Sequence, residues 1–100
     1  MNRRVIYGPR VQGDLLNLYR YIAEAASPSI AAAYLERLDR HLKGYDLFGE
    51  RGSRRDDIRP KLRIVGFERR TAVLFEVSDE EVIFLRILYG GQDLDAALGD

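Results

Sequence analysis

The spacing of the apolar residues changes once along this chain, and the change separates a helical part from a strand part. Between residues 11 and 45 the apolar residues recur every three or four positions, which is the spacing of one helix face. After residue 61 the pattern becomes three β-type runs, at 62–67, 71–77 and 82–89. Two helices followed by three strands predict an α+β domain.

The helical part is divided at Ser27 and Pro28, because serine caps the free amides of a helix start and proline suits its first position. We therefore predict a helix of about four turns from Val11. A second helix follows, weakens near Gly44 and is over by Gly49. The predicted inner faces contain Val11, Leu15, Leu18, Ile22 and Ala25 or Ala26, then Ala31, Tyr34, Leu35, Leu38, Leu42 and Tyr45. We interpret the tyrosines at 19, 21, 34 and 45 as packing residues.

Residues 3–7 predict a short first strand that ends at Gly8 and Pro9, and residues 49–61 predict an exposed loop. The connections at 68–70 and 78–81 are short, so the last three strands should form antiparallel hairpins. Residues 92–100 predict a small C-terminal helical tail. The expected fold is thus one domain over residues 1–100: an N-terminal strand, a helical hairpin and a three-strand antiparallel meander in one sheet. The hairpin covers one face of the sheet, and the other can remain open.

The composition narrows the class of protein. One hundred residues make a single domain, and 46% hydrophobic with 32% charged residues is ordinary for a globular chain. The absence of cysteine excludes a disulfide framework and a thiolate nucleophile. The first residues lack the apolar core of a signal peptide, and no run reaches membrane-spanning length, so we expect a cytoplasmic protein.

The charge is distributed unevenly, although it is zero overall. Residues 51–70 carry 8 basic and 3 acidic groups, whereas residues 71–100 carry 1 basic and 7 acidic groups. The basic segment can present a positive patch to a phosphate backbone or to an acidic partner. It can equally be a solvated loop that the acidic end of the chain neutralises.

Three stretches together carry a resemblance to a known family: "DLLNLYRYIAEAASPSIAAAYLERL", "ERGSRRDDIRPKLR" and "VIFLRILYGGQD". They resemble the ParE branch of the RelE/ParE toxin superfamily, over nearly the whole chain. The resemblance implies a cytoplasmic toxin that inhibits DNA gyrase and so blocks replication. A cognate ParD-like antitoxin would silence it in a hetero-oligomer and would supply its only connection to DNA. The chain departs from the family pattern at Gly91 and Gln92, where two basic residues are usual.

Related toxins in the superfamily are ribosome-dependent messenger RNA endonucleases, which supply the main alternative. Arg63 and Arg86 match strand positions at which that branch binds phosphate. The proton-transfer groups are poor, since His41 lies mid-helix, Tyr89 is a weak base near neutral pH, and Glu76 can pair with an arginine. With no metal-ligand spacing and no phosphate-binding loop, we expect no catalytic residue, metal or cofactor. A non-toxic module that only binds antitoxin is a third possibility.

Two sets of residues are predicted to bind partners. The predicted surface for the toxicity target contains Arg63, Arg86, Tyr89 and Asp93. The predicted antitoxin contacts are Arg59, Arg63, Arg69 and Arg70. Arg86 has two possible roles: a structural arginine satisfied by a carboxylate or backbone oxygens, or part of a concave surface shared with Arg63. The strand register decides between them, because a shift of one residue moves a side chain to the other face.

Overall fold

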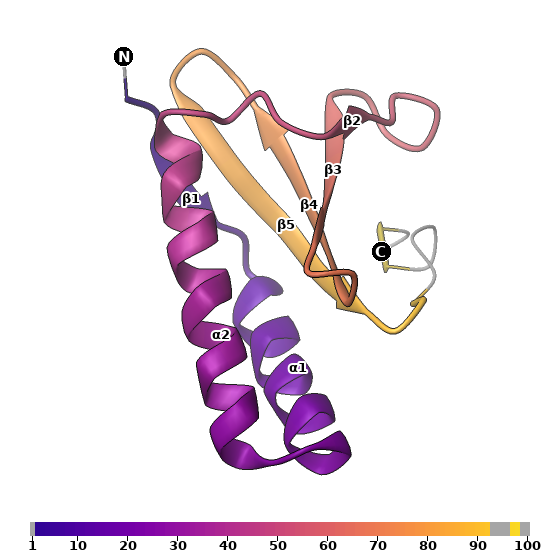
Figure 1. Cartoon of the computed structure of the whole chain (residues 1–100). Coiled ribbons are helices and arrows are strands. Elements are labelled where there is room, and N and C mark those ends of the chain that lie inside the picture. The colour runs from indigo at the N-terminus through magenta and orange to yellow at the C-terminus, as the bar shows by residue number, and fades with distance from the viewer. Residues whose placement is uncertain (1, 93–96, 99–100) are drawn as a thin grey trace.

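The computed structural model describes residues 2–92 and 97–98. Within them the chain forms two α-helices, a short 3₁₀ helix and a five-stranded sheet of order β1-β5-β4-β3-β2 (Figure 1). The elements are β1 (Arg4–Tyr7), α1 (Val11–Ala25), α2 (Pro28–Lys43), η1 (Gly44–Asp46), β2 (Ser53–Arg54), β3 (Leu62–Phe67), β4 (Thr71–Val77) and β5 (Glu81–Tyr89). The predicted α+β class and its helical hairpin are confirmed.

The helices begin and end where local signals predicted. The Ser27 side chain accepts the Ile30 N–H at 3.1 Å, and Pro28 is the first residue of α2. After Lys43 the helix tightens into η1, so it is over before Gly49 as expected. Figure 1 shows α1 and α2 side by side as an antiparallel pair against the sheet.

The meander is confirmed, but two features of the sheet differ from the prediction. β1 pairs in parallel with β5, from Arg4 opposite Glu81 to Tyr7 opposite Phe84, so the sheet is mixed. The predicted loop also contains β2, which pairs with β3 at Arg63 and Ile64. A strand of two exposed residues has no periodicity to detect, and a parallel pairing across most of the chain has no local signal.

The main core lies between the helices and one face of the sheet. The sheet contributes Val73 and Phe75 of β4 and Val82, Phe84 and Ile87 of β5, all fully buried. Tyr45 is also fully buried, and its ring meets Phe75 and Phe84 at centroid distances of 5.0 and 5.1 Å. The Tyr34 hydroxyl lies 2.7 Å from the Thr71 side-chain oxygen, so both buried polar groups are satisfied. Tyr34 and Tyr45 therefore pack as predicted, whereas Tyr21 is 43% exposed.

The other face of the sheet is partly covered. Leu62, Leu74 and Leu88 form a second buried cluster there, against which Ile58 of the 55–61 loop packs. Ala97 and Leu98 pack on the same cluster, on the far side of the sheet from the helices (Figure 1). The rest of the predicted C-terminal tail lies outside the described residues. Among the described helices, neither has the length and apolar character needed to cross a bilayer.

Candidate functional site

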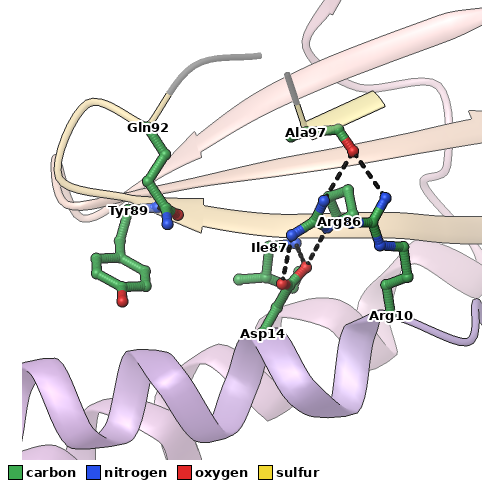
Figure 2. A network of polar contacts seen from close by, with 7 residues as sticks. All are labelled: Arg10, Asp14, Arg86, Ile87, Tyr89, Gln92 and Ala97. Carbon is green, nitrogen blue, oxygen red and sulfur yellow. Dashed lines mark hydrogen bonds and ion pairs between the residues drawn. The ribbon is translucent and has the colours of Figure 1, made fainter. Parts of the chain in front are cut away.

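Arg86 is committed to a buried ion pair with Asp14 of α1. Its Nε donates to one carboxylate oxygen at 2.7 Å and its Nη2 to the other at 2.8 Å, so the pair is bidentate (Figure 2). The side chains are only 14% and 8% exposed. Arg86 also donates to the Ala97 carbonyl at 2.7 Å, and Arg10 donates to the same oxygen at 3.1 Å. A buried guanidinium needs such partners, because an unpaired one would be strongly destabilising.

The same carboxylate closes an exposed edge of the sheet. β1 ends opposite Phe84, which leaves the edge of β5 beyond it without a neighbouring strand among the described residues. There the Ile87 N–H donates to Asp14 at 3.0 Å, so the side chain accepts the bond that a further strand would have accepted. The chain approaches β5 closely at Gly8, whose N–H donates to the Phe84 carbonyl at 2.8 Å. Only glycine fits there, because a Cβ would lie 2.7 Å from that oxygen.

The strand register separates Arg63 from Arg86. Arg63 lies opposite Phe75, on the face that the helices cover, and its Nη1 donates to the Arg51 carbonyl at 3.3 Å. Arg86 lies opposite Leu74 of the outer cluster, next to a bulge at Leu85. The two arginines therefore do not form one concave surface. Of the two predicted roles of Arg86, its bonds to Asp14 and to the Ala97 carbonyl support the structural one.

Tyr89 lies at the end of β5, on the opposite face from Arg86. Its ring packs on Tyr21 of α1 at a centroid distance of 4.7 Å, and Tyr21 remains 43% exposed. The Gln92 side chain accepts the Tyr89 N–H at 3.0 Å (Figure 2). The predicted contact Asp93 lies outside the described residues.

The β3–β4 turn lies beside this end of β5. Glu68 and Arg69 have positive φ angles of 47° and 61°, which side-chain-bearing residues rarely adopt. Arg37 of α2 holds the turn with two hydrogen bonds of 2.9 Å to the Glu68 carboxylate, and these bonds hold the pKa of Glu68 below its ordinary value. The Gly90 N–H contacts the Arg70 carbonyl at 3.4 Å, which joins the two strand ends.

The four arginines predicted to bind antitoxin fall into two groups. Arg59 pairs with Glu76 at 3.2 Å, and it lies with Arg63 toward the start of β3. Arg69 and Arg70 follow the other end of β3 and line a hollow of about 340 Å³. The four do not make a continuous basic surface.

The candidate proton-transfer groups also have internal partners. Nε2 of His41 lies 2.9 Å from the Tyr45 hydroxyl, and burial lowers the pKa of His41, with a smaller contribution from Arg51. Burial raises the pKa of Tyr45 to about 12. Glu76 forms its ion pair with Arg59. Among residues 2–92 and 97–98, no group of three or more histidine, aspartate or glutamate side chains is placed to hold a metal ion.

Sequence reasoning missed Asp14, and it interpreted Tyr21 as a packing residue although this residue is 43% exposed. A signal for Asp14 was available, since this carboxylate falls on the apolar stripe of α1, between the buried Val11 and Leu18. An acidic residue on a buried stripe requires a partner. Tyr21 had no comparable signal, because its exposure depends on how α1 packs beside the end of β5.

Comparisons with known proteins agree with this fold. The family model described as ParE toxin of type II toxin-antitoxin system, parDE, matches residues 5–94. Toxin ParE3 of Caulobacter vibrioides is 35% identical over 96 residues, which cover 96% of this chain and 95% of the relative. A chain from a solved structure, the chromosomal ParDE TA system from P. aeruginosa, superposes with a TM-score of 0.75 at 20% identity, over 87% of this chain and 95% of that one.

Proposed function

Since this chain belongs to the ParE toxin family of type II toxin–antitoxin systems, we propose that it stops bacterial growth by binding DNA gyrase and blocking replication. A ParD-type antitoxin would bind it in a hetero-oligomer and silence it. The antitoxin would also be its link to DNA. The proposed site of action is the cytoplasm, where gyrase works.

The observation that carries binding rather than bond cleavage is the use of the reactive groups inside the fold. Cleavage of RNA needs cations and proton-transfer groups around one phosphate. Here Arg86 is held by Asp14, and Arg63 lies on the other face of the sheet. His41 contacts the hydroxyl of the buried Tyr45. This arrangement supports a toxin that acts by occupying a surface of its target.

For the target we propose a surface centred on the end of β5. Tyr89 would contact gyrase directly, together with Asp93. Arg63 was predicted for the same surface, but it lies toward the start of β3, so gyrase would reach it separately from the end of β5. Arg86 would act as a positioning residue, since its bonds to Asp14 and Ala97 fix the strand that carries Tyr89.

For the antitoxin we propose an amphipathic segment that lies against the helical hairpin and the edge of the sheet. It would bind as a helix in a groove or as an added strand, with acidic side chains near Arg59, Arg63, Arg69 and Arg70. The separation of these arginines into two groups implies that the segment extends along β3, from one group to the other.

The test is expression of the chain in bacteria, alone and with its cognate antitoxin. Gyrase inhibition predicts filamentation and DNA-damage signalling with intact messages, and loss of supercoiling activity when purified gyrase is mixed with the toxin. Cleavage of messages on translating ribosomes would support the endonuclease alternative and reject the proposal. Normal growth at a confirmed level of expression would support a non-toxic module.

A further inference from the structure

Two small residues create a hollow on the outer face of the sheet. Gly66 of β3 pairs with Ala72 of β4, which pairs with Leu88 of β5. Two of the three residues in this cross-strand row therefore have no side chain or only a methyl group above the sheet. The result is the hollow of about 340 Å³ that Arg69 and Arg70 line at one end. A Cβ built on Gly66 would meet no atom within 4 Å, so the space above this residue is open. The hollow can accept an apolar side chain.

The strand beside the hollow has a free edge. β2 pairs with β3 only at Arg63 and Ile64, and no described strand covers the edge from Val65 to Phe67. An uncovered edge offers backbone donors and acceptors to an extended chain. An apolar hollow and a free strand edge at the same place favour a peptide over a phosphate backbone.

The rim of the hollow provides positive charge from Arg69 and Arg70. Among residues 2–92 and 97–98, the Arg69 side chain has no hydrogen bond or ion pair, and the Arg70 guanidinium lies 5.9 Å from the centroid of the Tyr34 ring. The nearby carboxylate of Glu68 is already engaged by Arg37. Because that ion pair holds the turn, the backbone that carries Arg69 and Arg70 is positioned before any ligand arrives.

We propose that this hollow binds an extended peptide segment in which an apolar residue stands next to an acidic one. The peptide backbone pairs with the β3 edge at Val65–Phe67, the apolar side chain enters the hollow at Gly66, and the carboxylate meets Arg69 and Arg70. This inference rests on the proposed function, because the antitoxin is the proposed source of the segment. It assigns one part of that segment to the outer face, away from the helical hairpin.

The direct test is an NMR titration of the purified full chain with a blocked heptapeptide of alternating leucine and glutamate. The expected result is saturable shifts of the backbone amides of Gly66, Gly90 and Gly91. A heptapeptide of alternating leucine and lysine should not produce them. A thymidine dodecamer that shifts the same amides at lower concentration than the acidic peptide would overturn the assignment in favour of nucleic acid. Shifts confined to α1 and α2 would overturn the location.

Two kinds of variant separate the parts of the proposal. Arg69→Glu/Arg70→Glu should weaken peptide binding at least about tenfold, whereas Arg20→Glu/Arg40→Glu, with the same change of charge on exposed helix positions, should not. Gly66→Leu should block binding by filling the hollow while both arginines remain. Retained peptide affinity in both test variants, with native amide spectra, would reject the site.

Growth arrest and gyrase inhibition are measured separately on the same variants. Loss of peptide binding together with unchanged growth arrest supports the peptide site and leaves the proposed toxin function intact. Peptide binding at the hollow in a chain that does not inhibit gyrase would reject the proposed target and support the peptide site. A variant pair with normal growth arrest and normal peptide affinity rejects the inference alone.

Discussion

Arg86 and Arg69 are the same residue type with opposite surroundings, and they show how position decides what an arginine does. Arg86 is 14% exposed and is satisfied by Asp14 and the Ala97 carbonyl. Arg69 is exposed on a turn, at a backbone angle that resists side chains. The first arginine joins α1, β5 and the Ala97 carbonyl. The second is directed outward by a turn that another ion pair stabilises.

A match to a functional position in a related family therefore does not by itself identify a functional side chain. Arg63 and Arg86 were predicted to match phosphate-binding positions of related nucleases, yet the register places them on different faces of this sheet. Arg69 and Arg70 lie on a short turn between strands, and there the structure leaves charge available. Replacing the partner of Arg86 should therefore change the stability of the fold, whereas replacing Arg69 should change the affinity for the peptide.

Replacement of Asp14 should have the largest effect on stability. Asp14→Ala leaves the Arg86 guanidinium buried without its carboxylate and leaves the Ile87 N–H without an acceptor. The expected loss is about 3–5 kcal/mol in the free energy of unfolding, measured by urea denaturation. Asp39→Ala is the matched control, because its ion pair with Lys43 is exposed, and it should cost only about 0.3–0.5 kcal/mol. Equal losses would mean that the Asp14 pair contributes no more than a surface pair.

A double-mutant cycle should show that Asp14 and Arg86 act as a unit. Arg86→Met removes the charge while keeping an apolar stem, so Asp14→Ala/Arg86→Met no longer buries an unpaired guanidinium. The double variant should therefore be more stable than the sum of the single losses predicts, by about 2 kcal/mol. Additive losses, measured under the same conditions, would show that the two side chains contribute independently.

Most of the fold could be predicted because its signals are local. Ser27 and Pro28 mark the joint of the hairpin, and the short connections after β3 and β4 require antiparallel neighbours. β2 could not be predicted, since its two residues are polar and exposed. The parallel pairing of β1 with β5 depends on the whole chain closing on itself.

The site was harder to predict for a related reason. Asp14 and Arg86 are 72 positions apart, and the bulge at Leu85 that sets the position of Arg86 has no glycine to mark it. The hollow depends on Gly66 and Ala72 lying opposite each other, which only the register reveals. Arg59, Arg63, Arg69 and Arg70 were chosen by charge alone. Charge does not show that Arg59 pairs with Glu76 or that Arg63 bonds the Arg51 carbonyl.

Replacement of Arg69 should raise stability while it lowers binding. Arg69→Gly relieves a residue held at a φ of 61°, and glycine adopts this angle without a steric penalty. The expected gain is about 1 kcal/mol in the free energy of unfolding. The same variant should bind the leucine–glutamate peptide more weakly, because one of the two rim charges is gone. Lys61→Gly is the matched control, because it also removes a positive charge from a residue at a positive φ, 70°, but Lys61 does not line the hollow. It should leave the affinity nearly unchanged.

The smallest expected effect concerns the acid sensitivity of the turn. The hydrogen bonds from Arg37 hold the folded-state pKa of Glu68 below its ordinary value, so the ionised carboxylate is favoured by folding. This contribution is complete above the unfolded pKa, and it is lost as the pH falls through the lower, folded value. The parent chain should therefore lose slightly more stability than Glu68→Gln when the pH is lowered from about 5 to about 3, as followed by thermal unfolding. Glu36→Gln removes a carboxylate from the exposed face of α2 and should leave the acid loss of the parent chain unchanged. An identical acid response in the parent and in Glu68→Gln would mean that the Arg37 pair does not hold the turn, and the backbone conformation at Arg69 would then need another cause.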